Sequence, residues 1–469
     1  MNKYTKLITN TAVLALGTLG SKLLVFFLMP LYTRLLSSSE YSTADIITQT
    51  ANLLIPLVSL GMYEAVFRFA MDKHRSKEEV LTTGLFMTLA GGAVFGIAVP
   101  FCSRIAYFDG YFVLIYIYVL TSSVHYLVSR YTRAIGKNTL FAVQGILATA
   151  LNILFNMIFL IGFDMGVTGY VASVIVSDFL MIVFLFIALG LPGQIRLSRF
   201  NRELLAEMLK YSVPLIPTTV FWWVTNVSDR YIIKGVIGDA TNGLYAAAFK
   251  IPTILLLLSS VFTEAWNFSA VVESVDGKQA HAEFFGRVFN SFQGLLFMSA
   301  AGLIAFSKLF ASILFAPSYY EAWRYMPLLI VATVYSSLVT FMGSVYLVDK
   351  KSMMSFITAF IGALVNIGLN ILLIKPLGAN GAALATFVCY FIVYIIRAVT
   401  TKKLIPFDQH TVKVALNTAI LLVQTVFMLF ELRCWIIVQI AGIAAIFALN
   451  AGPILGGIGR LLKKLGKRA

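Results

Sequence analysis

Apolar runs long enough to cross a lipid bilayer follow one another along almost the whole chain. A transmembrane helix needs about 20 mostly apolar residues, and the 469-residue sequence holds about fourteen such runs, separated by short polar segments. Only 12% of the residues are charged, about half the share of an ordinary soluble domain. The sequence therefore predicts an all-α, polytopic membrane protein. The expected spans are 10–36, 42–70, 80–107, 111–135, 139–162, 167–191, 211–234, 240–267, 285–307, 323–348, 353–374, 379–400, 411–430 and 434–453.

Lysine and arginine alternate between crowded and sparse loops. If the N-terminus is cytoplasmic, the inner loops and tails hold roughly three times as many of these residues as the outer loops. Cytoplasmic loops of membrane proteins show this enrichment, so we expect both termini to be cytoplasmic. The net charge of +15 fits this topology better than nucleic-acid binding, because the basic residues fall between apolar runs instead of forming one patch.

Two polar segments have the pattern of amphipathic helices. In the linker 193–210, Leu204 and Met208 share one helical face, which predicts a helix lying on the inner membrane surface. The tail after the last span repeats this design with Lys463, Lys464 and Lys467 on its polar face. We expect anionic lipid headgroups to be the partner of that tail.

Several short motifs recur in the two halves of the chain. Asn152 and Asn156, followed by Gly166 and Gly169, reappear as Asn366 and Asn370, followed by Gly378 and Gly381; Glu64 matches Glu264, and Tyr41 matches Tyr245. These matches predict two copies of a six-helix unit in the same orientation, a design found in transporters. The expected domains are an N-lobe at 1–192, the linker 193–210, a C-lobe at 211–404, and a lipid-facing accessory pair of helices with the basic tail at 405–469. The asparagines are expected to hydrogen-bond across helices.

Motifs around span 7 resemble a known family. The motifs are Tyr211-Ser212-Val213-Pro214-Leu215-Ile216-Pro217, Asp229-Arg230-Tyr231, Gly243-Leu244-Tyr245-Ala246, Lys250-Ile251-Pro252 and, in span 1, Pro30-Leu31-Tyr32-Thr33-Arg34 with Glu40-Tyr41. They resemble bacterial lipid-linked oligosaccharide flippases of the multidrug, oligosaccharidyl-lipid and polysaccharide exporter superfamily, although Ser42 stands where that family commonly has Gly.

The resemblance covers essentially the whole chain, and it implies a structure and an activity. It implies two lobes around a central hydrophilic cavity, in a bacterial cytoplasmic membrane. The implied substrate is an undecaprenyl-diphosphate-linked oligosaccharide, moved from the inner to the outer leaflet by alternating access for O-antigen, capsule or exopolysaccharide synthesis. Polysaccharide polymerases and glycosyltransferases would be partners.

Ionisable side chains within the spans are functional candidates because they are costly in hydrocarbon. Lys22 lies about eleven residues into the first span and Lys250 about ten residues into the eighth. Such cations can replace water around a diphosphate headgroup, so we expect both to line the substrate cavity. The alternative is that each lysine pairs with a structural carboxylate such as Asp45 or Asp178.

Charged and polar residues elsewhere in the spans form a second group of candidates. Arg34 and Arg230 lie near the outer ends of spans 1 and 7, where they could receive or release the headgroup, or act as interfacial anchors. His125 is the one histidine well inside a span. Its position is more typical of a structural hydrogen bond than of a proton relay.

Acidic residues at matching inner positions are candidates for gating or ion coupling. Glu64 and Glu264 lie near the inner ends of spans 2 and 8. Arg68 and Asp45, in the same span as Glu64, are further candidates. The alternative for Glu64 is a salt bridge with Arg68, four residues further along the same helix.

Enzymatic and cofactor motifs are missing from the sequence. There is no G-x-x-x-x-G-K-[ST] pattern for ATP, and no cluster of His, Asp and Glu that resembles a metal or hydrolase site. The three cysteines lie far apart. The sequence therefore predicts a non-enzyme without cofactor or metal. Two alternatives stay open: a multidrug-type exporter of the same superfamily, and a polysaccharide polymerase or ligase, which would need a larger outer loop.

Overall fold

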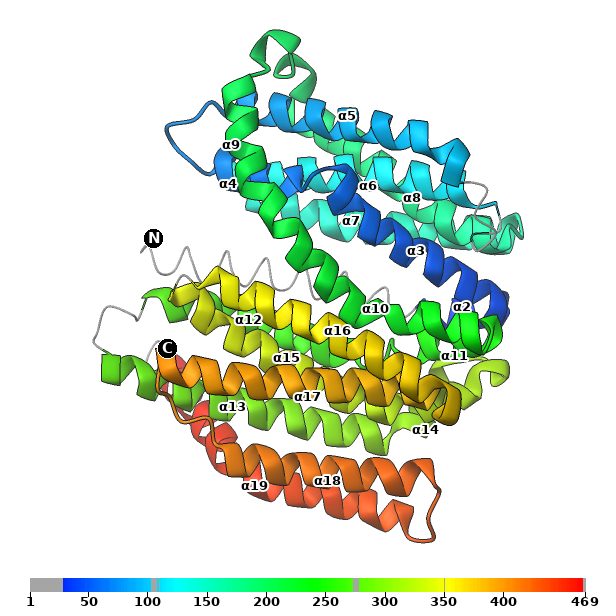
Figure 1. The fold of residues 1–469 in the computed structure, drawn as a ribbon, viewed down its shortest axis with the longest axis vertical. Helices are drawn as coiled ribbons and strands as arrows, with labels where there is room; N and C mark the ends of the chain where they lie inside the picture. The colour runs from blue at the N-terminus through cyan, green and yellow to red at the C-terminus, as the bar shows by residue number, and fades with distance from the viewer. Residues whose placement is uncertain (1–27, 103–107, 109, 273–277, 350, 467–469) are drawn as a thin grey trace. The chain divides into compact units, whose positions relative to one another are not determined.

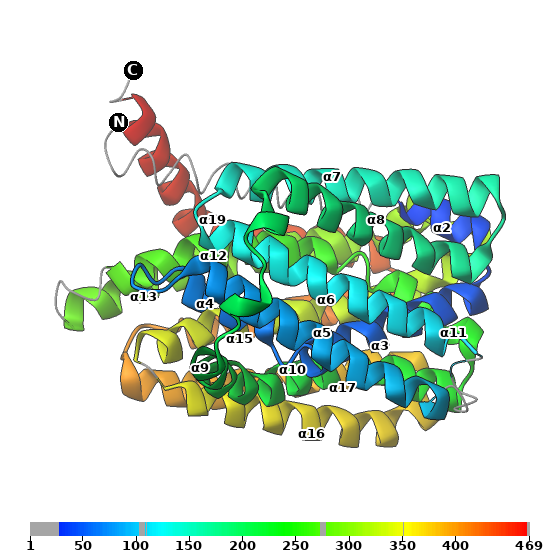
Figure 2. The same cartoon turned by 90° about the horizontal axis from the view of Figure 1, so that it is seen from above.

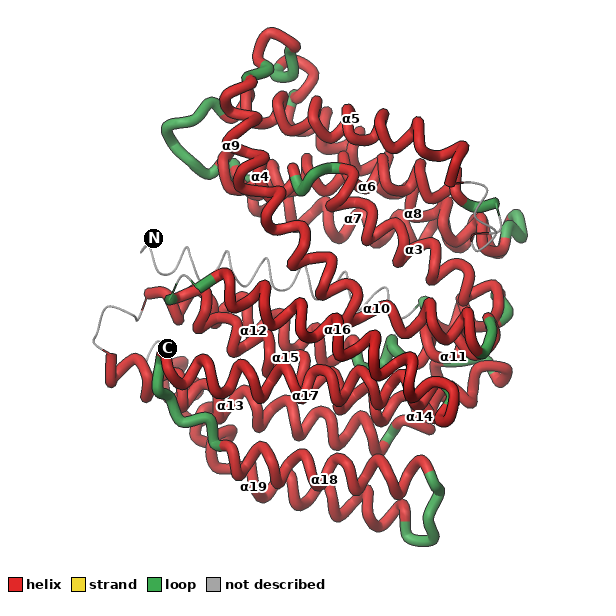
Figure 3. The backbone as a smooth tube through the Cα atoms, viewed as in Figure 1, coloured by secondary structure: helices red, strands yellow, loops and turns green. Residues whose placement is uncertain are grey.

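Helices make up nearly all of the part of the chain that the structure describes. The structure is a computed structural model that describes residues 28–102, 108, 110–272, 278–349 and 351–466. No strand occurs within these ranges (Figure 3). The chain divides into two compact units, Met1–Trp223 (unit 1) and Val224–Ala469 (unit 2).

The helices of unit 1 are α2 (Met29–Leu35), α3 (Ser38–Val58), α4 (Met62–Ala70), α5 (Lys77–Cys102), α6 (Phe112–Ala134), α7 (Asn138–Asn156) with a π-helical end (Met157–Gly162), α8 (Gly166–Leu189) and α9 (Arg202–Ser212). The helix α10 (Ile216–Val236) crosses the boundary between the units. Unit 2 continues with α11 (Asp239–Ala248), α12 (Thr253–Val272), α13 (Lys278–Ala305), α14 (Ser307–Leu314), α15 (Met326–Val348), α16 (Ser352–Leu377), α17 (Ala379–Leu404), α18 (Thr411–Leu429) and α19 (Trp435–Gly466).

Many of these helices have the length and composition of membrane spans. Among the described residues ten helices qualify, or twelve if two bent helix pairs each form one span. The chain is therefore a multi-pass membrane protein. The expected span 10–36 lies mostly outside the described residues, and α10, in place of the expected span 211–234, is not among the qualifying helices. The number fourteen and the two repeats stay predictions.

Two spans that we expected to be continuous are broken. α3 and α4 meet at an angle of 55°, because Pro56 removes a helical hydrogen bond and Leu60 and Gly61 adopt positive φ angles of 50° and 65°. α11 and α12 meet at 43°, next to Pro252. The expected spans 42–70 and 240–267 are therefore each two helices.

The core of unit 1 forms around α6, which packs against α3, α4, α5 and α8. Figure 1 shows α5, α6 and α8 side by side. Leu127 of α6 is fully buried in a cluster with Val66 and Leu81. α9 forms where the linker helix was expected, but Leu204 and Met208 are buried in the same cluster. Its apolar face therefore packs on α4 and α5 of unit 1.

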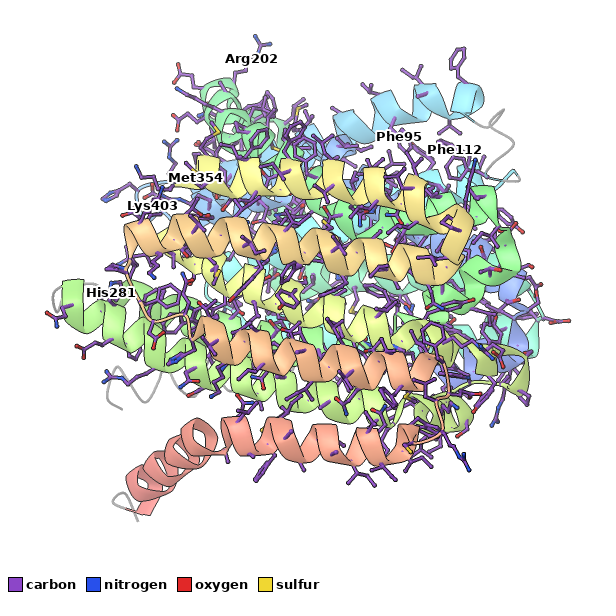
Figure 4. All side chains as sticks on the ribbon, turned by 60° about the horizontal axis from the view of Figure 1, so that its bottom comes forward. Phe95, Phe112, Arg202, His281, Met354 and Lys403 are labelled. Carbon is purple, nitrogen blue, oxygen red and sulfur yellow. The ribbon has the colours of Figure 1, made fainter. Side chains whose placement is uncertain are left out.

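The core of unit 2 forms around α15, which contacts α12, α13, α17 and α18. α16 and α17 lie side by side (Figure 1, Figure 2). Figure 4 places Met354, Lys403 and His281 at one end of this unit, where α16 and α13 begin and α17 ends. These three segments were all expected on the cytoplasmic side.

The accessory helices α18 and α19 are joined to α13 by buried amides. Asn450 of α19 donates to Asn417 Oδ1 of α18 at 3.0 Å, and Asn417 donates to Gln293 Oε1 of α13 at 3.4 Å. The other side of the pair is exposed and apolar, with Ile440 and Phe447 on it. The accessory pair, which we expected to face lipid, therefore has two different faces. One face is exposed and apolar, and the other carries the buried amides that bond to α13.

Candidate functional site

A chain of hydrogen-bonded polar side chains runs through the interior of unit 1. Asp178 of α8 accepts from Ser122 of α6, and its other oxygen lies 2.8 Å from His125 Nδ1. His125 Nε2 lies 2.9 Å from Gln144 Oε1 of α7, and Gln144 Nε2 donates to Ser129 Oγ at 2.9 Å. We call these five residues the polar chain.

The sequence of α6 explains the positions of three of the five residues of the polar chain. Ser122, His125 and Ser129 are three and four residues apart, so they lie on one face of the helix. His125, Asp178 and Gln144 are less than one-tenth exposed. Buried polar groups in a membrane must find partners inside the protein, and here each has one or two. Asp178, considered above as a partner for a buried lysine, bonds a histidine and a serine among the described residues.

The polar chain ends at a cavity of about 360 Å³ in unit 1. Ser129 lines this cavity together with Tyr63, Tyr126 and Phe141. Arg130 and Glu64 lie on its wall, and Arg130 Nη2 is 2.9 Å from Glu64 Oε1. A cavity of this size holds water, so the polar chain meets an aqueous space next to an ion pair.

Arginines gather beside this cavity. The guanidinium groups of Arg130 and Arg133 lie 5.6 Å and 5.8 Å from the ring centre of Phe67. Arg133 is also 5.4 Å from the ring centre of Phe141. These contacts hold two positive charges against aromatic faces, a setting suited to an anionic group.

The expected site residues of unit 1 do not form one cluster. Lys22 lies outside the described residues. Arg34 is exposed at the end of α2, and Asp45 is buried in α3 near Gln49, whose Nε2 is 3.4 Å from Asp45 Oδ1. The partner of Glu64 within the described ranges is Arg130, 66 residues away, while Arg68 is exposed. The expected i,i+4 salt bridge with Arg68 is thus replaced by a cross-helix pair.

In unit 2, Arg230 and the Lys250 segment lie together. Arg230 is 5% exposed, and its guanidinium lies 4.9 Å from the ring centre of Phe249. The backbone N–H of Arg230 donates to Asp229 Oδ1 at 2.9 Å, and Tyr245 donates to Asp229 Oδ2 at 2.5 Å. Lys250 is half-buried at the break between α11 and α12. The structure therefore places Arg230 against Phe249, the residue that precedes Lys250.

Asparagine pairs make similar bonds in the two units. Asn156 donates to the Asn152 carbonyl at 2.7 Å, and Asn370 donates to the Asn366 carbonyl at 2.9 Å. Asn366 also makes cross-helix bonds of the expected kind: it accepts from Ser228 of α10 at 2.8 Å and donates to Thr386 of α17 at 3.3 Å. The side chain of Glu264 lies outside the described residues.

Within the described ranges, no group of three or more His, Cys, Asp or Glu side chains is placed to hold a metal ion. The polar sites consist of half-buried arginines in unit 1, a buried arginine in unit 2, and amides and single carboxylates. This arrangement is suited to binding anions and exchanging protons.

Comparison with known proteins gives the family. Residues 7–266 match the sequence model of a family described as polysaccharide biosynthesis protein, which is more than half of the chain. The chain belongs to the polysaccharide biosynthesis protein family. This family match covers unit 1, all of α10 and α11, and most of α12.

Curated relatives of this polysaccharide biosynthesis family member share low sequence identity. It is 22% identical over 224 residues to the multidrug export protein MepA of Staphylococcus aureus, in strains bovine RF122 / ET3-1 and MRSA252. The match covers 43% of this chain and 49% of MepA. The chain thus spans about half the length of the curated relatives it matches.

Solved structures share the fold of this family member over most of its length. The lipid II flippase MurJ in an inward closed conformation matches with a TM-score of 0.70 at 14% identity, covering 95% of this chain and 99% of MurJ. An inward-facing multidrug resistance MATE transporter of the MOP superfamily matches with a TM-score of 0.62 at 15% identity, covering 83% and 95%. The chain therefore shares the fold of these two solved structures.

Sequence reasoning missed several residues of this family member's polar sites. Arg130 and Arg133 were counted only as inner-loop charges, and Gln144 was not considered. The spacing of Ser122, His125 and Ser129 could have indicated a polar face on α6. Nothing in the local sequence pairs that face with residues on α7 and α8.

Proposed function

We propose that this family member moves a polyprenyl-diphosphate-linked oligosaccharide from the inner to the outer leaflet of a bacterial cytoplasmic membrane by alternating access, with both termini cytoplasmic. The observation that carries this proposal is the extent of the structural likeness. The flippase fold covers 95% of the chain, whereas the MATE fold covers 83%. The difference, about a tenth of the chain, is similar in size to the α18–α19 pair.

Cations in unit 2 support an anionic substrate. Arg230 is buried, and Lys250 is half-buried at the break between α11 and α12. Phe249 holds the guanidinium of Arg230 against its ring face, and cation–π contacts of this kind stabilise a charge away from water. In the proposed function, these two positive charges would attract the diphosphate headgroup.

The arginines of unit 1 provide a matching feature near the expected inner side. Arg130 and Arg133 rest on Phe67 and Phe141 beside the 360 Å³ cavity. They are placed to meet a headgroup arriving from the inner leaflet. The membrane potential would assist outward movement, because one elementary charge moving through 100 mV corresponds to about 2.3 kcal/mol.

The two helix breaks supply places where spans can change shape. α3 and α4 meet at Leu60 and Gly61, and α11 and α12 meet at Lys250 and Pro252. Residues at element ends commonly absorb the backbone changes of domain closure. In this proposal the α11–α12 break carries a substrate-binding lysine, so binding and bending occur at one point.

A small-molecule exporter is the second candidate. The sequence similarity to the multidrug export protein MepA over 224 residues supports it. It predicts that loss of the gene sensitises cells to cationic drugs and leaves lipid-linked glycans unchanged. The flippase proposal predicts the reverse. The polymerase or ligase alternative predicts lipid-linked repeat units that reach the outer leaflet but stay unpolymerised.

The test uses a deletion strain whose lipid-linked glycans are assayed by leaflet. The proposal expects complete repeat units to accumulate facing the cytoplasm, with recovery on expression of the wild-type chain. Arg230→Gln and Lys250→Gln are expected to lower recovery on the order of tenfold, the effect of losing about 1.4 kcal/mol of interaction with the anion. Lys351→Gln, at an exposed position, is the matched control. Full recovery by both site variants would contradict the assigned cations.

A further inference from the structure

We propose that the His125–Asp178 pair in unit 1 is a proton-binding site that exchanges its proton with the neighbouring cavity through Gln144 and Ser129. This inference rests on the proposed function only for its role in transport. The site itself rests on the hydrogen-bond geometry of the polar chain.

The orientation of Gln144 fixes the hydrogens on His125. Gln144 Nε2 donates to Ser129 Oγ at 2.9 Å, so Gln144 Oε1 faces His125 Nε2 at 2.9 Å. An amide oxygen only accepts, and therefore Nε2 carries a hydrogen. Nδ1 lies 2.8 Å from Asp178 Oδ1, and the bond between them also contains a hydrogen. The arrangement thus holds one proton more than a neutral imidazole beside a carboxylate.

A second arrangement satisfies the same groups with one proton fewer. If the Gln144 amide rotates by half a turn, its NH₂ donates to the bare His125 Nε2 and its oxygen accepts from the Ser129 hydroxyl. His125 Nδ1–H still donates to Asp178, and Ser122 still donates to the other carboxylate oxygen. Both protonation states therefore leave every member of the chain bonded. Leaving a buried donor or acceptor without a hydrogen bond costs free energy. The polar chain avoids this cost in both protonation states.

The surroundings contain few groups that would fix the charge of the pair. α7 has no charged residue, and Asp178 is the one charged residue of α8. Charges on α5 lie in its first turn, and the Glu64 carboxylate of α4 is paired with Arg130 of α6. The titratable groups on the helices packed against the pair are Tyr63, Glu64 and Arg68 on α4, Tyr116, Tyr118, Tyr126, Arg130, Tyr131 and Arg133 on α6, Tyr170 on α8, Glu40, Tyr41 and Asp45 on α3, and Lys77, Glu78, Glu79 and Cys102 on α5.

The cavity gives the proton a route. Ser129 lines the 360 Å³ space and is bonded to Gln144, which is bonded to His125. In the exchange Gln144 turns, a hydronium ion in the cavity gives up H⁺ and becomes water, and the proton is added to His125 Nε2. One O–H bond breaks and one N–H bond forms, while Gln144 and Ser129 change only their hydrogen-bond partners. Protonation converts a buried net charge of minus one on the pair to zero.

This change in charge links the proton to the proposed transport cycle. A buried carboxylate without a counter-charge is costly in a membrane, so the two protonation states of unit 1 differ in which conformations they favour. Three helices, α6, α7 and α8, meet at the pair. A proton bound on one side of the membrane and released on the other would thus drive the repositioning of these helices.

The direct test is ¹⁵N nuclear magnetic resonance of the full chain in lipid nanodiscs, with histidine labelled. The chain has four histidines, and His125→Gln assigns the signal by removing it. The proposal expects His125 to change between a doubly and a singly protonated ring across a range of about pH 5 to 9. Asp178→Asn should leave it singly protonated throughout. A wild-type His125 ring that keeps one protonation state over this range would overturn the site.

The transport test uses proteoliposomes containing a fluorescent polyprenyl-diphosphate-linked disaccharide. The wild-type rate should change by up to about tenfold per pH unit on one limb of its profile. His125→Gln should flatten that limb, and so should Gln144→Glu, which keeps the ring charged. His281→Gln is the control, because His281 is equally buried but lies in unit 2. The pH profiles of His125→Gln and Gln144→Glu are compared with that of the wild type only when the purified variants are monodisperse and helical.

The two experiments separate the two proposals. If the wild type titrates at His125 but moves no lipid, the proton site stands and the flippase proposal fails. If the wild type moves lipid and His125→Gln leaves the pH profile unchanged, the flippase proposal stands and the proton's role in transport is wrong.

Discussion

Arg130 Nη2 lies 2.9 Å from Glu64 Oε1, so α6 and α4 are joined by an ion pair between residues 66 positions apart in the chain. The pair borders the cavity into which the polar chain opens. Its side chains are about one-third exposed, so its contribution to stability is small. In the proposed function, its place beside the cavity gives it a role in transport.

Exchange of the two charges tests this pair. Glu64→Gln and Arg130→Gln should each lower the free energy of unfolding by about 0.2–1 kcal/mol, the range for partly exposed pairs, and each should lower transport. The double variant Glu64→Arg with Arg130→Glu restores the attraction and should recover stability. Thermal unfolding in detergent and the leaflet assay measure the two effects. Additive losses in the double variant would show that the residues do not interact.

Gly61 is expected to tolerate no side chain at the α3–α4 break. Its φ angle is +65°, and an added Cβ would lie 3.3 Å from the Cβ of Ser212. Ser212 also donates to the Leu60 carbonyl at 2.8 Å, which ties the start of the inter-unit segment to the break. Gly61→Ala should destabilise unit 1 by about 1–2 kcal/mol because of the left-handed backbone.

The control for Gly61 is Gly145 of α7. A Cβ at Gly145 would meet nothing within 4 Å, so Gly145→Ala should be neutral or stabilising by about 0.5–1 kcal/mol through helix propensity. Melting temperatures of the two variants give the comparison. Equal effects of the two substitutions would argue against a strained break.

The buried hydrogen bonds between the amides of α13, α18 and α19 should contribute measurably to the free energy of unfolding. Asn450→Ala removes the hydrogen bond to Asn417 and leaves the Oδ1 atom of Asn417 with one partner fewer. Interhelical hydrogen bonds in membranes contribute about 0.6 kcal/mol on average and up to about 1.7 kcal/mol. Leu449→Ala, at an exposed neighbouring position, is the control. Unfolding of Asn450→Ala at the wild-type temperature would show that packing alone holds the pair.

A pH effect is expected outside the spans, at Glu431. The Lys308 ammonium bonds its carboxylate and lowers the pKa of Glu431 below the usual value. Lys308 also lies 4.4 Å and 4.7 Å from the ring centres of Trp323 and Trp435. Because the pKa of Glu431 is lower in the folded protein, its stabilisation is present above the unfolded value of about 4.3 and disappears as the pH falls through the folded value.

The measurement compares melting temperatures of wild type and Glu431→Gln over a pH series. The wild type should be more stable at neutral pH, and the two curves should converge in acid. A constant difference at all pH values would mean that Glu431 acts through packing and not through its charge.

Local patterns in the sequence predicted the helices better than their partners. Apolar runs gave α5 to α8 and α15 to α18 close to their observed bounds, because the length needed to cross a bilayer is set by the bilayer. α13 begins before its expected span, α14 matches no expected span, and α19 continues past the expected end at 453. The breaks at Gly61 and Pro252 were missed, although glycine and proline mark such positions. The apolar sequence continues through both breaks, and hydropathy alone does not detect a bend in a helix.

The polar sites could be predicted only in part. Glu64 was predicted to act in gating or ion coupling, with a salt bridge to Arg68 as the alternative; the structure pairs it with Arg130. An i,i+4 pair can be read from spacing, whereas Arg130 approaches only through the packing of α4 on α6. The same holds for His125 and Asp178. Single-sequence patterns report neighbours within one helix and do not contain the contacts between helices.

The central claim is that the chain moves a lipid-linked glycan between leaflets, and reconstitution tests it most directly. The purified full chain is placed in liposomes with a fluorescent polyprenyl-diphosphate-linked disaccharide, and a membrane-impermeant quencher reports the fraction in the outer leaflet over time. The account predicts that lipid from the inner leaflet becomes quenchable with wild-type protein and much more slowly with Arg230→Gln. Protein-containing liposomes that protect the same fraction as protein-free liposomes would contradict it.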